Sequence, residues 1–119
     1  RVWGRVADKT GTVDLPLIVD WPNRPRQKVD FDQGKPALTD WRVAKYEHNA
    51  TRVRLYPKTG RSHQLRVHMR EIGHPILGDP FYAEGEARNA PRLMLHAESL
   101  RLRHPDGGVG MNFSAKCPF

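Results

Sequence analysis

The segment from Thr59 to His68 carries the densest set of side chains able to do chemistry. It reads Thr-Gly-Arg-Ser-His-Gln-Leu-Arg-Val-His, a turn that leads directly into a predicted helix. The first amides of a helix favour an anion, and Arg61 adds a fork of donors suited to phosphate or carboxylate. Arg66, one turn further along, can hold an ionised carboxylate. An ordinary amphipathic helix with solvated arginines fits the same residues, so this pattern alone leaves both interpretations open.

Other catalytic chemistries have less support in the sequence. His63 and His68 are five residues apart, about 140° around a helix, and do not readily share a metal ion. Convergence of His63, His68, His74 and Asp79 after folding is the alternative for a metal site, and a metal-dependent nuclease that uses His63, His68 and Asp79 is a further hypothesis for the function. Cys117 has no activating base nearby in sequence, and no Gly-rich phosphate loop of known spacing occurs. We therefore expect no metal site.

The charge of the chain indicates a partner. Its 119 residues include 20 Lys and Arg against 13 Asp and Glu, a formal net charge of +7. A polyanion is the simplest partner for such a chain, although a merely soluble basic domain has the same composition. Pro22 and Pro25 keep the loop around the first basic group extended. The three basic groups are Arg24, Arg26 and Lys28; Arg52, Arg54 and Lys58; and Arg61, Arg66 and Arg70.

Length and composition limit the class of protein. The chain fits one compact domain, and 38% hydrophobic and 28% charged residues are typical of a globular chain. No apolar run approaches the roughly 20 residues of a membrane-spanning helix, and nothing directs secretion. The single cysteine cannot form an internal disulfide, which favours a reducing compartment. We expect a cytoplasmic protein with no membrane partner.

Alternation of apolar and polar residues predicts a sheet built from hairpins. Because residue 1 is Arg and residues 2–6 already alternate like a strand, we expect the chain to begin inside an element, as a fragment or processed product. A hairpin is predicted over residues 39–56, with Thr51, Val53 and Leu55 facing inward. The other predicted strands are residues 13–19, interrupted by Pro16, and residues 92–103 and 109–115, joined by a turn at 104–108, with a bulge near Glu98 and Ser99.

One helix is predicted, over residues 63–72. Ser62 is expected to cap its start and Gly73 to follow its end. Leu65, Met69 and Ile72 form the expected buried stripe, with Arg66 and Arg70 on the adjoining face. Strands outnumber helices and no βαβ repeat occurs, so the predicted class is α+β with a mainly antiparallel sheet and few helices.

Three motifs, in this order and spacing, resemble the C-terminal half of the RluA-type pseudouridine synthases. They are the segment Thr59 to His68, then Gly73-His-Pro-Ile-Leu-Gly-Asp-Pro-Phe-Tyr82, then Arg92-Leu-Met-Leu-His-Ala97. The similarity covers essentially the whole chain, and residues 15–29 look like the member that accepts both 23S rRNA and tRNA. The resemblance implies that residues 1–119 are the C-terminal portion of a single pseudouridine synthase catalytic domain. It also implies cofactor-free conversion of uridine to pseudouridine, RNA partners (23S rRNA and/or a tRNA anticodon stem-loop) and a monomeric full-length protein.

The same resemblance assigns roles to residues. Arg66 corresponds to the basic residue that pairs with the catalytic aspartate, and Leu95 to the apolar residue that lines the uracil pocket. Residues around Asp79 resemble a packing segment rather than a second acid. Residues expected to contact RNA or shape the same cleft are Arg24, Arg26, Lys28, Arg61, Ser62, His63 and Gln64.

Part of the family pattern is missing from this sequence. The Arg-Leu-Asp motif that carries the catalytic aspartate does not occur, nor does the Thr-Ser-Gly that follows it, nor the tyrosine that stacks on the target base. We therefore expect the 119-residue chain to have no turnover by itself. A non-catalytic RNA-binding module is the alternative function from a different class.

Overall fold

The computed structural model describes residues 1–96, 99–103 and 110–114. Its largest element is a four-stranded antiparallel sheet in the order β1-β6-β5-β2. The strands of this sheet are β1 (Val2–Trp3), β2 (Thr10–Asp14), β5 (Leu38–Glu47) and β6 (Ala50–Pro57). Two smaller antiparallel pairs are β3 (Leu17–Val19) with β4 (Gln27–Val29), and β7 (Ser99–Arg103) with β8 (Gly110–Ser114). The helical elements are α1 (Gln64–Glu71) and the 3₁₀ turns η1 (Trp21–Asn23) and η2 (Gly85–Asn89). The predicted α+β class is confirmed.

The hairpin of β5 and β6 confirms the clearest sequence prediction. Glu47 pairs with Ala50 across a two-residue turn, and Asn49 takes the left-handed conformation (φ 54°) that such turns need. Thr51 is buried, and Val53 and Leu55 pack against the core, as the alternation predicted. On the opposite face of the hairpin, Arg42, Arg54 and Tyr56 are exposed.

Two N-terminal predictions change in detail. The strand expected over residues 2–6 stops after Trp3, because Gly4 has a positive φ of 76° and turns the chain. The run over residues 13–19 is two strands rather than one: β2 ends at Asp14 and β3 begins at Leu17 in a different sheet. Pro16 lies at the break, where its missing N–H costs no ladder hydrogen bond.

The strand predicted over residues 92–103 is shorter than expected. Residues 92–96 are not in a strand, and Met94 is buried, with its N–H donated to the Leu77 carbonyl at 2.8 Å. The apolar residues there pack on the core rather than on a pleated face, so β7 begins only at Ser99. The predicted turn at 104–108, the bulge at Glu98 and Cys117 lie outside the described residues.

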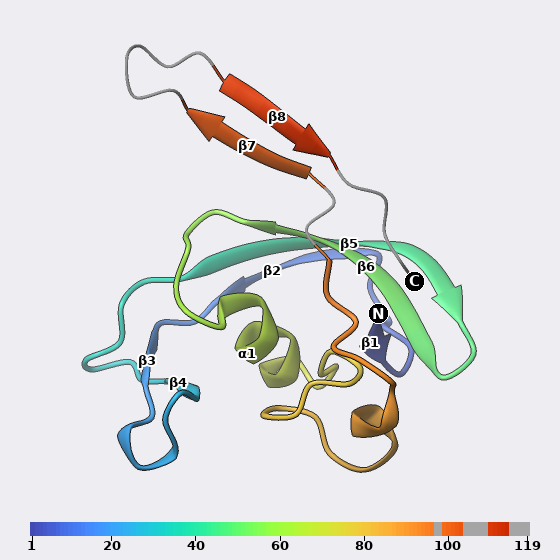
Figure 1. Cartoon of the computed structure of the whole chain (residues 1–119), viewed down its shortest axis with the longest axis horizontal. Helices are drawn as coiled ribbons and strands as arrows, with labels where there is room; N and C mark the ends of the chain where they lie inside the picture. Colours follow the sequence, from blue (N-terminus) through green and yellow to red (C-terminus); the bar gives the residue numbers. More distant parts are fainter. Residues whose placement is uncertain (97–98, 104–109, 115–119) are drawn as a thin grey trace.

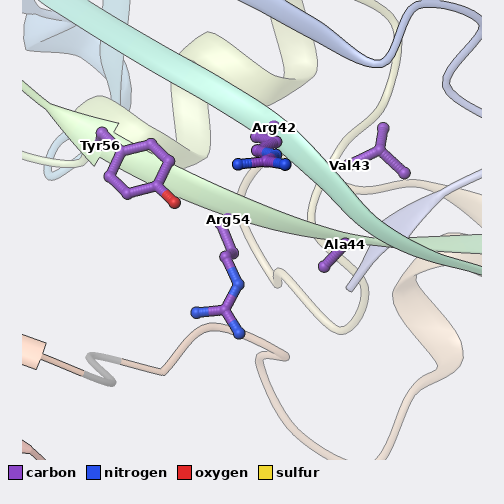
Figure 2. Close-up of a pocket in the computed structure, with 5 residues that line it drawn as sticks. All are labelled: Arg42, Val43, Ala44, Arg54 and Tyr56. Carbon is purple, nitrogen blue, oxygen red and sulfur yellow. The ribbon is translucent and has the colours of Figure 1, made fainter.

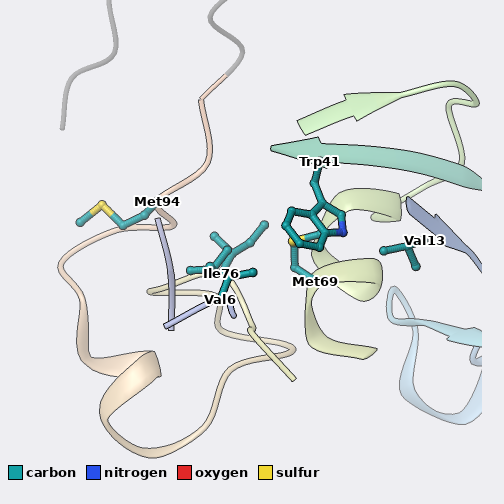
Figure 3. Close-up of a cluster of buried hydrophobic side chains, with 7 residues drawn as sticks. Val6, Val13, Trp41, Met69, Ile76 and Met94 are labelled. Atoms are coloured by element: carbon teal, nitrogen blue, oxygen red, sulfur yellow. The ribbon is translucent and has the colours of Figure 1, made fainter. Parts of the chain in front are cut away.

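The sheet curls over α1 (Figure 1). The main core cluster combines residues of the sheet strands with Met69 of α1. Trp41 of β5 lies over Met69 of α1 in the middle of this cluster (Figure 3). The buried members of the cluster are Val2, Val6, Val13, Trp41, Met69, Ile76 and Met94. A second cluster of Leu17, Ala37, Val67 and Tyr82 covers another side of α1.

The start and the buried face of α1 differ from the prediction. Ser62 does not cap the helix; His63 precedes it in a left-handed conformation, with no side-chain cap. The Arg61 N–H instead donates to the Gln64 side-chain oxygen at 3.0 Å. Leu65 is only partly buried, because α1 is covered on two sides and buries Gln64, Val67, His68 and Met69. Ile72 does pack against the main cluster.

Within the described residues, no helix has the length and apolar character needed to cross a membrane.

Gly11 of β2 lies directly against the indole ring of Trp41. Gly11 pairs with Trp41, and a Cβ at position 11 would overlap the indole ring. We expect Gly11→Ala to lower the free energy of unfolding by about 1–3 kcal/mol, the usual cost of overpacking, measured by chemical denaturation. Gly60→Ala is the matched control, because a Cβ there meets no atom within 4 Å. Equal stability of the two variants would contradict this packing.

Candidate functional site

A buried ion pair between Arg66 and Asp79 forms the centre of the site. Arg66 Nε donates to Asp79 Oδ2 at 2.8 Å, and Nη2 donates to Oδ1 at 2.7 Å. The Asp79 side chain is fully buried, and that of Arg66 is 14% exposed. The backbone N–H groups of Phe81 and Tyr82 also donate to Oδ1, at 2.9 and 3.2 Å. The carboxylate therefore accepts four hydrogen bonds.

These contacts set the charge states of the pair. Burial alone would raise the pKa of Asp79, but the hydrogen bonds from Arg66, Phe81 and Tyr82 and the Arg66 charge hold that pKa below its ordinary value. The hydrogen bond to Asp79 raises the pKa of Arg66. Both groups are ionised at neutral pH. No acceptor within the described ranges binds Arg66 Nη1, so one end of the guanidinium remains available for a second acceptor.

The sequence did not predict the partner of Arg66 in this chain. Residues around Asp79 were expected to pack, and Asp79 is packed, but it also neutralises Arg66. The signal lay in the Gly78-Asp-Pro-Phe81 segment: an aspartate inside an apolar stretch is buried only when a cation or several donors compensate its charge. The expected pairing of Arg66 with a catalytic aspartate remains a prediction.

Aromatic rings surround the Arg66 guanidinium. Its Cζ lies 5.3 Å from the Phe81 ring centroid and 5.4 Å from that of Tyr82. His63 stacks on Phe81 with the ring centroids 5.8 Å apart, and the Tyr82 hydroxyl lies 2.7 Å from His63 Nδ1. That hydroxyl accepts the Gln27 N–H at 2.8 Å, which leaves its own proton to donate to Nδ1. Burial lowers the pKa of His63, and the nearby charge of Arg66 lowers it further, so the imidazole ring is neutral at neutral pH.

The predicted RNA-binding loop is attached to this cluster. Arg26 lies over the Phe81 ring at 5.8 Å, and the Gln27–Tyr82 hydrogen bond anchors β4. Arg24 lies over the Trp21 ring at 4.2 Å, and Lys28 is exposed on β4. The structure thus brings Arg26, His63 and Arg66 together around Phe81 and Tyr82. Arg24 lies at the tip of the same hairpin and Lys28 within β4.

A chain of buried polar groups fixes the other side of α1. His68 Nε2 donates to the Leu15 carbonyl at 3.0 Å, and the Thr39 hydroxyl donates to His68 Nδ1 at 2.9 Å. Gln64 Nε2 donates to Thr39 Oγ1 at 2.9 Å, and the Thr59 hydroxyl donates to Gln64 Oε1 at 2.6 Å. Because the Leu15 carbonyl only accepts, this pattern requires the neutral Nε2–H form of His68. Burial lowers the pKa of His68 in the same sense.

The remaining predicted site residues are distributed around α1. Gln64 is 4% exposed and supports the turn before the helix. Arg61 is exposed and donates from Nε to the Pro36 carbonyl at 2.8 Å, and Ser62 is exposed beside it. Leu95 packs against the main core cluster. No group of three possible metal ligands occurs among the described residues, and His68 and Asp79 already have their hydrogen-bonding atoms engaged, so the nuclease interpretation gains no support.

A second basic surface lies on the outer face of β5 and β6. Arg42 and Arg54 are directly opposite each other in register. They line a shallow groove of about 450 Å³ with Val43, Ala44 and Tyr56 (Figure 2). Trp41 and Leu55, which alternate with these residues, face the core, so the groove is on the sheet face away from α1 and Arg66.

Comparison with known proteins identifies the family. Residues 3–71 match the family model described as RNA pseudouridylate synthase. The chain is 60% identical to the dual-specificity RNA pseudouridine synthase RluA of Escherichia coli (strain K12) and 58% identical to that of Pasteurella multocida (strain Pm70), over 100% and 99% of its length. A solved structure, human RNA pseudouridylate synthase domain containing 1, superposes with a TM-score of 0.84 at 32% identity, covering 99% of this chain and 52% of that one.

The chain therefore belongs to the RNA pseudouridylate synthase family. It spans about half the length of the curated relatives that it matches, 55% in both cases above. The membership that the three motifs predicted from the sequence is confirmed.

The buried His68 predicts a pH dependence of stability. Its pKa in the folded chain is below the ordinary 6.5, so as the pH falls the unfolded chain binds the proton first. The contribution of His68 to the free energy of unfolding should be complete above about pH 6.5. Below that pH the free energy of unfolding should decrease, by at most about 1.4 kcal/mol per pH unit for this one group. His68→Gln should flatten that decrease in denaturation curves recorded from pH 5 to 8. His48→Gln, in the exposed β5–β6 turn, is the control, and an unchanged slope in His68→Gln would contradict the assignment.

Proposed function

We propose that residues 1–119 are the C-terminal portion of the catalytic domain of an RNA pseudouridine synthase, an isomerase that converts uridine to pseudouridine. The observation that carries this proposal is the Arg66 guanidinium. It is largely buried, held in one orientation by Asp79, and open at Nη1. The guanidinium lies beside the rings of Phe81 and Tyr82. The chain that carries it belongs to the RNA pseudouridylate synthase family.

The reaction needs an ionised carboxylate, and among the residues that the structure describes none binds the Nη1 end of Arg66. In the family mechanism, the N-glycosidic bond is cleaved, the uracil turns, and it is rejoined through carbon 5. An arginine beside an aspartate lowers the pKa of that aspartate by roughly 1–3 units and keeps it ionised at neutral pH. We infer that the aspartate comes from sequence outside residues 1–119, and that Arg66 Nη1 is its contact.

Substrate binding is assigned to the surfaces around Arg66. A base must leave its stack before its glycosidic bond is accessible, at a cost of a few kcal/mol that basic and aromatic contacts offset. Leu95 is proposed to line the uracil pocket, with His63 on the wall of the cleft and Gln64 supporting it from behind. The residues proposed to contact RNA directly are Arg24, Arg26, Lys28, Arg61 and Ser62; all five are exposed.

The relatives favour particular substrates. The two curated relatives are named dual-specificity RNA pseudouridine synthases. We propose that the protein containing this chain acts on 23S rRNA and/or a tRNA anticodon stem-loop, in the cytoplasm where both RNAs occur, and without a cofactor. A non-catalytic RNA-binding module is the second candidate, and the absence of an Arg-Leu-Asp motif from the sequence favours it.

The two candidates are separated by an assay of isomerisation. Rejoining at carbon 5 displaces the hydrogen there, so release of tritium from RNA labelled at C5 of uridine measures turnover. The natural protein that contains this chain should release tritium, and the 119-residue chain alone should bind RNA without releasing any. Turnover by the chain alone would show that no outside aspartate is needed, and no turnover by the longer protein would establish the binding module.

The role of Arg66 is tested in that longer protein. Arg66→Ala should reduce turnover by two or more orders of magnitude and change RNA affinity by only a few-fold, because a preorganised charge partner is lost. Because Asp79 would then be buried without its cation, the pair Arg66→Gln with Asp79→Asn is assayed beside it to separate misfolding from lost chemistry. Arg70→Ala, one turn along α1 and 40% exposed, is the matched control. Near-normal turnover in either Arg66 variant would reject the role.

A further inference from the structure

Trp21 presents an exposed aromatic ring at the tip of the β3–β4 hairpin. Its side chain is 62% exposed, and the Arg24 guanidinium lies over the ring at 4.2 Å. The tip lies at the end of the molecule where β3 and β4 are drawn, and it projects away from the main sheet (Figure 1). A guanidinium covers at most one face of an indole. The other face of the Trp21 ring therefore has room for a second flat group.

The tip that carries Trp21 is fixed by its own hydrogen bonds. The Asp20 N–H donates to the Arg26 carbonyl at 2.8 Å, and the Asn23 N–H donates to the Asp20 carbonyl at 2.9 Å. Arg26 N–H donates to the Asn23 carbonyl at 3.0 Å, and Asn23 Nδ2 donates to Asp20 Oδ2 at 3.0 Å. Trp21 lies inside this network, so little conformational freedom of the tip is left to lose on binding.

Rings and guanidinium groups connect the tip to Arg66. Arg24 lies on Trp21, Arg26 lies on Phe81 at 5.8 Å, and Arg66 lies on the same Phe81 ring at 5.3 Å. Lys28 adds a positive charge on β4, and the Asp20 carboxylate, which accepts from Asn23 Nδ2, adds a negative charge at the tip. The three exposed cations Arg24, Arg26 and Lys28 outnumber the one carboxylate of Asp20, so the net charge here is positive and complementary to a phosphate backbone. The aromatic rings alternate with these cations, as in surfaces that bind single strands.

We propose that Trp21 is a stacking platform for an unpaired base of the RNA other than the base that enters the Arg66 site, with Arg24 beside a backbone phosphate. The inference rests on the proposed function, because it takes RNA as the ligand. Only an unpaired base exposes a whole face to an indole, and every base has such a face, so this contact selects for single-stranded character and not for sequence.

Direct binding to the 119-residue chain tests the platform. The probes are a single-stranded oligouridylate RNA and a blunt RNA duplex of equal length. Trp21→Ala should weaken binding of the single strand roughly 5- to 150-fold, the range found for one stacked base, and should change duplex binding less than twofold. Trp21→Phe should recover most of the lost affinity. Phe31→Ala, which removes another exposed ring (76% exposed), is the matched control and should bind like the unaltered chain.

Salt dependence separates stacking from charge. Trp21→Ala should leave the slope of log affinity against log salt unchanged, because no phosphate contact is removed. Arg24→Ala should reduce that slope by about 0.7, the value for one single-strand phosphate contact. Trp21 is one of three tryptophans in the sequence, and RNA should quench its fluorescence in the unaltered chain and much less in Trp21→Phe.

The possible outcomes are distinguishable. Three results would overturn the platform while leaving RNA binding intact. They are fluorescence quenching that persists in Trp21→Phe, an RNA affinity of Trp21→Ala within twofold of the unaltered chain, and a loss of affinity in Phe31→Ala equal to that in Trp21→Ala. Failure of the unaltered chain to bind either RNA would overturn the RNA-binding part of the proposed function as well. Selective loss of single-strand affinity with an unchanged salt slope would support the platform.

Discussion

The ion pair of Arg66 with Asp79 is the interaction on which the site depends. A fully buried carboxylate is tolerated only when its charge and lone pairs are compensated, and here Arg66 and two backbone amides do this. The pair joins α1 to the 78–82 segment, and that segment carries Phe81 and Tyr82. These rings hold His63, Arg26 and the β4 backbone. One electrostatic contact therefore orients both the guanidinium and the loop beside it.

The opposite side of α1 has a matching constraint. The chain of Gln64, Thr39 and His68 ties the helix to β5 and to the Leu15 carbonyl, and its side-chain polar atoms are engaged without a formal charge. Rotation of α1 about its axis would break this network on one side and expose the Asp79 carboxylate on the other. Buried polar networks of this kind specify one arrangement, because every alternative leaves a donor or acceptor unsatisfied. Arg66 is thus presented in one direction.

The parts of the fold that the sequence predicted are those determined by local pattern. Period-two alternation and the turn at His48 and Asn49 were sufficient to predict the β5–β6 hairpin. The motif around Arg66 was sufficient to select this residue as a candidate for the site. The left-handed His63 could not be predicted, because Tyr82 and Phe81 hold it from a distant segment. Asp79 was missed as a partner for the same reason. Leu93 and Leu95 alternated like a strand, yet they pack on the core as irregular chain.

A double-mutant cycle on the ion pair tests the account most directly. The free energy of unfolding is measured for the unaltered chain, Arg66→Gln, Asp79→Asn and the double variant. Removing Arg66 alone leaves an uncompensated buried charge and should cost about 3–5 kcal/mol, whereas removing both charges should cost much less, giving a coupling energy of at least about 2 kcal/mol. Additive losses, with a coupling energy near zero, would show that the pair does not hold the site together.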